Sequence, residues 1–365
     1  MPSNGGHSLS GSRSADPVLV ADLGATYLRV ALARDGRLGQ VLRCRTADLA
    51  TDSSLGLIPG IVDAMREVLG AASNREPSGA QGAMEPVAVG LGVPAAVDRD
   101  GRLRWTLDSS LPSGTVIRDA IQTAVGVPVA IDNDANMAVL GEHCRGAGRD
   151  TTNFVLLTLG TNVGMGAVVE GQIFRGASGG AGEAGMLLVP VEEMGTTPEP
   201  DGRRFVDAGR FGVGLSRAPA GYAWLEELVG GRALVRAAED ATARRPRMGG
   251  PAGAPGGAHR PPHVFREAAA GNLRARELVD RAIEGWALTI ANLVAILDPE
   301  AIALAGGLVT DVAPFLDQLR SRATELSRVP PRILVAELGS RAGLVGAEIA
   351  ARRVIGDAEI NEGAA

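Results

Sequence analysis

Apolar and polar positions along this chain predict short buried strands separated by helices. Continuous apolar runs that end in a glycine turn or an acidic residue are typical of buried strands. These runs occupy residues 18–24, 86–93, 127–131, 152–161, 301–309 and 332–336. Apolar residues recur at helical spacing in other segments. These segments are residues 55–70, 115–125, 264–297, 312–327 and 343–352. This mixture of strands and helices predicts an α/β fold.

One order of elements occurs twice along the chain. Residues 18–46 read as a buried strand, a glycine turn, a second strand, an acidic-glycine hairpin and a third strand. Residues 152–177 repeat that order, with Glu170 and Gly171 at the hairpin. A repeated order of this kind predicts two structurally similar halves.

A chain of 365 residues is long enough for two domains. We predict a disordered tail at 1–17 and an N-terminal α/β domain over 18–134, which the C-terminal helix 343–354 rejoins. A larger α/β domain follows over 135–342. The stretch 244–263 is rich in proline and glycine, which predicts a mobile loop.

Charge and composition exclude several classes of protein. The net charge of −6 argues against a nucleic-acid binder, which needs a basic surface. No apolar run reaches membrane-spanning length, and the first 16 residues lack the apolar core of a signal peptide. We therefore expect a cytoplasmic protein. The two cysteines, Cys44 and Cys144, are too few for a disulfide framework or a four-thiolate metal site.

Polar residues crowd the end of the strand at 127–131. Asp132, Asn133 and Asp134 follow it directly, and Asn136 comes two residues later. Aspartate and asparagine are poor in the interiors of helices and strands. They can form a turn and a helix cap, with Asp132 in the turn and Asn136 capping. Alternatively, they place a catalytic carboxylate at the mouth of a cleft.

Two glycine turns follow buried strands, "DLGAT" at 22–26 and "TLGTNVG" at 158–164. Backbone N–H groups at glycines can approach an anion closely, and Thr26 and Thr161 add hydroxyl donors. Neither turn fits a Walker loop or the dinucleotide fingerprint. Two such turns at equivalent places predict a clamp for a triphosphate across a cleft. Asp22 could hold Mg²⁺ through water, or it could be a turn residue only.

Four segments in this order resemble the ROK sugar-kinase family of bacterial glucokinases and N-acetylhexosamine kinases. The segments are "VLVADLGATYLRVALARDGRL", "VPVAIDNDANMAVLGE", "VLLTLGTNVGMGAVVEGQIFRGASGGAGEAG" and "ILDPEAIALAGGLV". The resemblance covers about 18–352. It implies a two-domain, actin-like (ribonuclease H-like) fold with a cleft between the domains. It also implies ATP and Mg²⁺, a small polyol acceptor and a homodimer.

The resemblance implies roles for single residues. Asp134 matches the general base that takes the proton of the acceptor's primary hydroxyl, while Asn133 and Glu183 match ligands of the ring hydroxyls. The residues that match the phosphate turns and the adenosine side are Gly24, Thr26, Gly160, Thr161, Gly306 and Gly307. The alternatives are a solvated loop acid for Glu183 and a helix-entry turn for the glycine pair.

The chain departs from the family after Glu183. Typical members continue into a histidine and a cysteine-rich segment that binds structural zinc. This chain has Met186 at the histidine position and no cysteine after Cys144, so we expect no zinc. An alignment across the longer segment that follows places Glu226 on the second sugar-binding glutamate. The alternative for Glu226 is an exposed helical acid.

These departures suggest a changed acceptor. Methionine cannot donate a hydrogen bond to a sugar hydroxyl, and it offers an adaptable apolar wall. Ala95, Asn162 and Met165 also differ from the usual pattern. One hypothesis is therefore a C7-cyclitol of the valienone type from antibiotic biosynthesis, phosphorylated on its exocyclic primary hydroxyl. The alternatives are a hexose, with glucokinase activity, and a non-catalytic sugar-binding regulator.

Two further points concern function. Sugar-responsive repressors with the same body carry an N-terminal winged helix-turn-helix. Only 17 residues precede the first strand here, so DNA binding is not expected. The phosphoryl donor, ATP or polyphosphate, stays open at this point.

Overall fold

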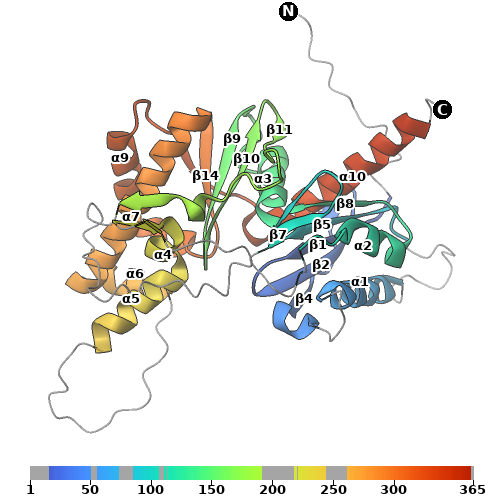
Figure 1. The fold of residues 1–365 in the computed structure, drawn as a ribbon, viewed down its shortest axis with the longest axis horizontal. Coiled ribbons are helices and arrows are strands. Elements are labelled where there is room, and N and C mark those ends of the chain that lie inside the picture. The colour runs from blue at the N-terminus through green and yellow to red at the C-terminus, as the bar shows by residue number, and fades with distance from the viewer. Residues whose placement is uncertain are drawn as a thin grey trace, which may run out of the picture.

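The computed structural model describes residues 16–50, 56–73, 85–106, 111, 113–190, 218–219, 221–243 and 261–362. Most of the expected tail at 1–17 and of the expected loop at 244–263 lies outside the described residues. The described residues form two α/β halves that lie side by side (Figure 1). Among them, no helix combines the length and the apolar character needed to cross a membrane.

The first sheet has the strand order β3-β2-β1-β5-β8, with β4 also paired to β2. Its strands are β1 (Val18–Leu23), β2 (Tyr27–Arg34), β3 (Arg37–Leu38), β4 (Leu42–Arg45), β5 (Ala88–Val93) and β8 (Val129–Asn133). Strand β2 runs antiparallel to β1, while β5 and β8 run parallel to it. The expected third strand at 37–46 is split into β3 and β4 by residues 39–41.

The second sheet has the order β11-β10-β9-β14-β15. Its strands are β9 (Phe154–Leu159), β10 (Val163–Val169), β11 (Gln172–Ile173), β14 (Ala301–Ala305) and β15 (Ile333–Val335). Here too the first three strands, β9, β10 and β11, pair antiparallel, while β14 runs parallel to β9 and β15 runs parallel to β14. The shared order and directions confirm the prediction of two similar halves.

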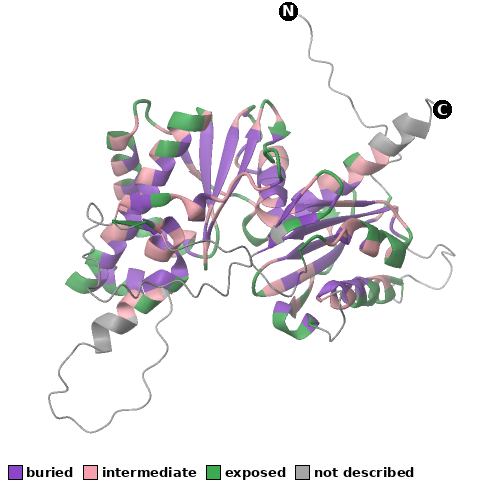
Figure 2. Ribbon diagram, viewed as in Figure 1, coloured by how far each residue is buried: buried purple, intermediate pink, exposed green. Residues whose placement is uncertain are grey.

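Helices cover both faces of each sheet, and the strands between them are buried (Figure 2). Helices α1 (Ile58–Ser73) and α2 (Ile117–Val125) pack on one face of the first sheet. Helix α10 (Ala342–Glu362) packs on its other face. Helix α7 (Leu273–Leu297) packs on the second sheet, and α3 (Asp134–Arg145) covers that sheet's other face.

Further elements complete the two halves. They are the hairpins β6 (Ala95–Val97) with β7 (Leu103–Thr106) and β12 (Leu188–Pro190) with β13 (Tyr222–Trp224), and the helices α4 (Leu225–Val229), α5 (Gly231–Ala243), α6 (Pro261–Ala269), α8 (Val309–Val312) and α9 (Leu316–Leu326). In the described parts of the chain, 3₁₀ turns lie at Thr46–Leu49, Ala184–Met186, Ala313–Phe315 and Gly339–Arg341.

The single helix expected at 264–297 is two helices. Gly271 takes a positive φ of 92°, which ends α6, and the Asn272 side chain then caps α7 by accepting from two backbone N–H groups. The helix expected at 312–327 is likewise interrupted, by the 3₁₀ turn at Ala313–Phe315. In both segments the apolar spacing continues across the point where one helix ends and the next begins.

Helices α3 and α10 cross in close contact between the two halves. A side chain at Gly346 would collide with the backbone carbonyl of Met137, so only glycine allows this approach. The crossing brings the first turns of both helices, at Asp134 and Ala342, to the same cavity. The N–H groups of a helix's first turn favour negative charge, so these two turns favour negative charge on their side of the cavity.

Candidate active site

A cavity of about 350 Å³ lies between the two halves and draws its walls from both. The first half contributes the ends of β1 and β8, and the second half contributes the β9–β10 turn. Of the residues singled out from the sequence, the cavity is lined by Asp22, Gly24, Ala95, Asn133, Asp134, Thr161, Asn162, Met165, Glu183, Glu226 and Gly306. One cavity thus unites residues that lie more than 280 positions apart.

Four of the expected site residues are not in this lining, namely Thr26, Gly160, Gly307 and Met186. Gly160 closes the β9–β10 turn by donating its N–H to the carbonyl of Asn162. Met186 ends the 3₁₀ turn that follows Glu183. The methionine that does line the cavity is Met165, on β10. The apolar wall expected at position 186 is therefore supplied from position 165.

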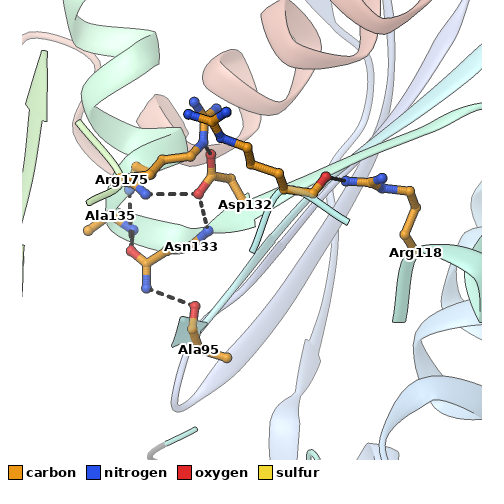
Figure 3. A network of polar contacts seen from close by, with 8 residues as sticks. Ala95, Arg118, Asp132, Asn133, Ala135 and Arg175 are labelled. Carbon is orange, nitrogen blue, oxygen red and sulfur yellow. Dashed lines mark hydrogen bonds and ion pairs between the residues drawn. The ribbon is translucent and has the colours of Figure 1, made fainter. Parts of the chain in front are cut away.

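Asn133 is the cap of α3, which corrects the expectation that Asn136 caps it. The Asn133 side chain accepts from the N–H groups of Ala135 at 2.9 Å and Asn136 at 3.3 Å. Its amide nitrogen donates to the carbonyl of Ala95 at 3.3 Å (Figure 3). The cap directs the next residue, Asp134, into the cavity at the first position of the helix.

The pKa of Asp134 is raised to about 7. Burial is the largest cause, because it disfavours the charged form, and the nearby carboxylates of Asp22 and Glu183 add to it. A hydrogen bond from the Ala135 N–H works in the opposite direction. A carboxylate with a pKa near neutrality can accept a proton from a hydroxyl and release it again.

Two glutamates of the second half line the same cavity as Asp134. Burial and then the charge of Glu226 raise the pKa of Glu183 to about 7, and burial also raises the pKa of Glu226. Glu183 precedes the 3₁₀ turn at Ala184–Met186, while Glu226 lies on α4. Both line the cavity, so the alternatives of a solvated loop acid and an exposed helical acid do not fit. Carboxyl groups at these places can bind the hydroxyls of a polyol.

Arg29 lies in the cavity, although the sequence analysis did not single it out. It is the cross-strand partner of Asp22, and its Nη1 lies 3.0 Å from Asp22 Oδ2. Burial raises the pKa of Asp22, and the Arg29 charge opposes that rise. Among the described residues that line the cavity, Arg29 is the only lysine or arginine. The sequence does contain a signal for this pair. A tight turn joins β1 to β2, which places Arg29 opposite Asp22 in the hairpin.

Gly306 and Gly343 line the cavity at positions where a side chain would collide with neighbouring atoms. Gly306 takes a positive φ of 96°, and a side chain there would collide with the backbone of Leu159. A Cβ at Gly343, on the first turn of α10, would lie 2.8 Å from the carboxyl carbon of Asp22. Within the described part of the chain, no group of three or more His, Cys, Asp and Glu residues could hold a metal ion by itself.

Asp132 is also more than a turn residue. Its side chain is buried, with 4% of its area exposed, and Arg175 Nε lies 2.6 Å from its Oδ2 (Figure 3). Its Oδ1 accepts from the Asn133 N–H and from the Asn136 side chain, each at 2.8 Å. Asp132 thus organises the polar cluster at the end of β8.

Comparisons with known proteins agree with this architecture. Residues 19–354 match the ROK family. The chain is 32% identical over 350 residues to a bifunctional enzyme NanE/NanK of Brucella melitensis, covering 94% of this chain and 55% of that protein. It is 30% identical over 289 residues to a glucokinase of Streptomyces coelicolor, covering 75% of this chain and 83% of the glucokinase. The chain thus spans about half the length of the bifunctional relatives.

Solved structures show the same fold. A ROK hexokinase from Thermus thermophilus is 28% identical, with a TM-score of 0.66 over 93% of this chain and 99% of the hexokinase. A ROK family glucokinase from Streptomyces griseus, solved with glucose and AMPPNP, is 25% identical, with a TM-score of 0.66 over 92% of this chain and 99% of the glucokinase. The expected two-domain, actin-like α/β fold is therefore confirmed. The match over residues 19–354 shows that this chain belongs to the ROK family.

Proposed function

We propose that the protein is an ATP-dependent kinase that phosphorylates the exocyclic primary hydroxyl of a hexose-like ring. One observation carries this proposal. Asp134, a carboxylate with a pKa of about 7, lies at the start of α3 in a cavity that residues of both glycine turns also line. Relatives named glucokinase and N-acetyl-D-glucosamine kinase support it.

The acceptor end of the proposed mechanism uses Asn133, Glu183 and Glu226 to hold ring hydroxyls. These groups fix the ring so that its primary hydroxyl meets the Asp134 carboxylate. Asp134 accepts the hydroxyl proton as the oxygen attacks the phosphoryl group. The pKa values of Asp134 and Glu183 are both raised to about 7, and an ionised Glu183 still accepts hydrogen bonds from ring hydroxyls.

The donor end fits a nucleoside triphosphate. Gly24 and Thr161 bring the two glycine turns to the cavity, and Gly306 leaves room for the nucleotide at the end of β14. Arg29 offers a positive charge to phosphoryl oxygens. Asp22 is a hard oxygen donor at the same end, as a magnesium site requires. Magnesium, when bound with ATP, supplies charge that neutralises the phosphoryl oxygens.

For the acceptor, we propose a hexose or N-acetylhexosamine first and a C7-cyclitol second. The cyclitol remains a candidate because Ala95, Asn162 and Met165, three departures from the usual pattern, all line the cavity. Its support is weaker than the sequence suggested, because Met186 does not line the cavity. The expected homodimer stays a prediction, which light scattering on the purified protein tests.

An acceptor panel tests the proposed function. ATP consumption is measured with glucose, mannose, N-acetylglucosamine, N-acetylmannosamine and valienone, using wild type and Asp134→Asn. We expect phosphorylation of at least one acceptor by wild type. The variant should keep acceptor binding, measured by calorimetry, and lose turnover by about 100-fold or more. Wild type that binds a sugar yet consumes no ATP with any acceptor would instead show a non-catalytic binding protein.

A further inference from the structure

The ion pair between Arg175 and Asp132 joins the two halves beside the acceptor end of the cavity. Asp132 lies in β8 of the first sheet, while Arg175 follows β11 of the second sheet. Their atoms Nε and Oδ2 are 2.6 Å apart. Asp132 is buried while 43% of the Arg175 side chain is exposed, so the arginine closes over the carboxylate from the solvent side.

On the first half, Asp132 is linked to the proposed catalytic base through Asn133 and Asn136. Its Oδ1 accepts from the Asn133 N–H and the Asn136 side chain, and Asn133 in turn caps α3. Asp134 is the residue that follows the cap directly. A shift of the Asp132 carboxylate would therefore move the cap and the first turn of α3, which carries Asp134.

On the second half, Arg175 begins the loop that carries Glu183. The Arg175 carbonyl accepts from the Ala181 N–H at 3.1 Å, which folds residues 175–183 back on themselves. Gly179 in this loop has a positive φ of 79°, and a side chain there would collide with the Val97 backbone of β6. The loop thus lies against the first half, and its last residue faces Asp134 in the cavity.

We propose that Arg175 is a positioning residue, whose ion pair with Asp132 sets the separation between Asp134 and Glu183 and so the fit of the acceptor. This inference rests on the proposed kinase function. It assigns a role to a residue that does not itself line the cavity. Errors of about 1 Å in the placement of reacting groups can lower rates by about 100-fold, so a partly exposed ion pair can matter for turnover more than for stability.

The test compares Arg175→Met with Arg175→Lys and with a matched control, Arg322→Met. Arg322 has a similarly exposed side chain, 38%, and pairs with Glu284 at 2.7 Å, and neither residue lines the cavity. Initial rates are measured with the best acceptor of the panel. We expect Arg175→Met to raise the acceptor KM about tenfold and to lower kcat, with the KM for ATP within twofold of wild type. Arg175→Lys should fall between, and Arg322→Met should match wild type.

Hydrogen exchange gives a second readout that needs no turnover. In Arg175→Met we expect faster exchange at the amides of Ala135, Asn136 and Ala181, and no such change in Arg322→Met. Unchanged exchange at these amides would overturn the proposal, and so would an unchanged acceptor KM in a protein whose Asp134→Asn variant is inactive. If wild type phosphorylates nothing, the kinase function fails, and the exchange result still decides the role of Arg175.

Discussion

Asp134→Asn should make the protein more stable at neutral and alkaline pH, although it lowers turnover by about 100-fold or more. The pKa of Asp134 is about 7 in the folded state, against 3.8 for an ordinary aspartate. Between pH 3.8 and pH 7, Asp134 therefore keeps its proton in the folded state, whereas the unfolded chain has already released it. Stability is lost as the pH rises from 3.8 to 7, because ionisation then favours the unfolded chain, and above 7 the folded protein must bury a charge. Asparagine has no charge to bury, and its oxygen can still accept from the Ala135 N–H.

The size of the gain follows from the two pKa values. Each pKa unit corresponds to about 1.4 kcal/mol, so a difference of about 3 units gives at most about 4 kcal/mol at pH 8. At pH 4 the same relation gives only about 0.5 kcal/mol. Asp134 is partly exposed to the cleft, and water there relieves part of the cost. We therefore expect a gain of about 1–3 kcal/mol at pH 8.

Urea denaturation followed by circular dichroism at pH 4, 6 and 8 measures this gain. The matched control is Asp132→Asn, the same chemical change two residues earlier. Asp132 accepts three hydrogen bonds, one from a charged arginine, so that variant should lose about 1–3 kcal/mol at pH 8. Opposite signs for the two variants are expected. An Asp134→Asn variant that is less stable than wild type at pH 8, or equally stabilised at all three values, would refute the reasoning.

Three further predictions concern turnover. The ratio kcat/KM should rise with pH through about 7, because Asp134 must be ionised to accept a proton; a flat profile from pH 5 to 8 would contradict this. Arg29→Met should lower kcat by about 10- to 100-fold with the acceptor KM within twofold, as initial-rate kinetics can show, whereas full kcat would exclude Arg29 from phosphoryl contact. Gly343→Ala should raise the KM for magnesium–ATP about tenfold, because the new Cβ would lie 2.8 Å from the Asp22 carboxyl carbon; equal effects on the acceptor KM would point to general misfolding instead.

The sequence predicted the parts of this protein that depend on local chemistry. Apolar runs located the strands β1, β5, β8, β9, β14 and β15, and the repeated order of elements predicted two similar halves. The end of β8 was recognised as a candidate site because carboxylates and amides are out of place there. These features need only residues that are neighbours along the chain, so their pattern can be read without the tertiary contacts.

Where two local explanations compete, the sequence was less reliable. Asn133 and Asn136 are both good helix caps, and only the geometry at the end of β8 shows that Asn133 is the cap and that Asn136 binds Asp132 instead. The helix break at Gly271 was missed for a similar reason, because the apolar spacing continues on both sides of it.

Only the tertiary structure decided how distant segments meet in the cavity. Helix α4 places Glu226 in the cavity, and Met165 supplies the apolar wall that was expected from Met186. The pair Asp22–Arg29 results from sheet register, and the pair Asp132–Arg175 results from contact between the halves. Such contacts depend on packing, above all on the close crossing of α3 and α10, and packing is a property of the whole chain. The sequence by itself thus determined the family, the sheets and the proposed base, while the fold decided which side chains surround that base and set its pKa, because burial and neighbouring charge exist only once the two halves are assembled.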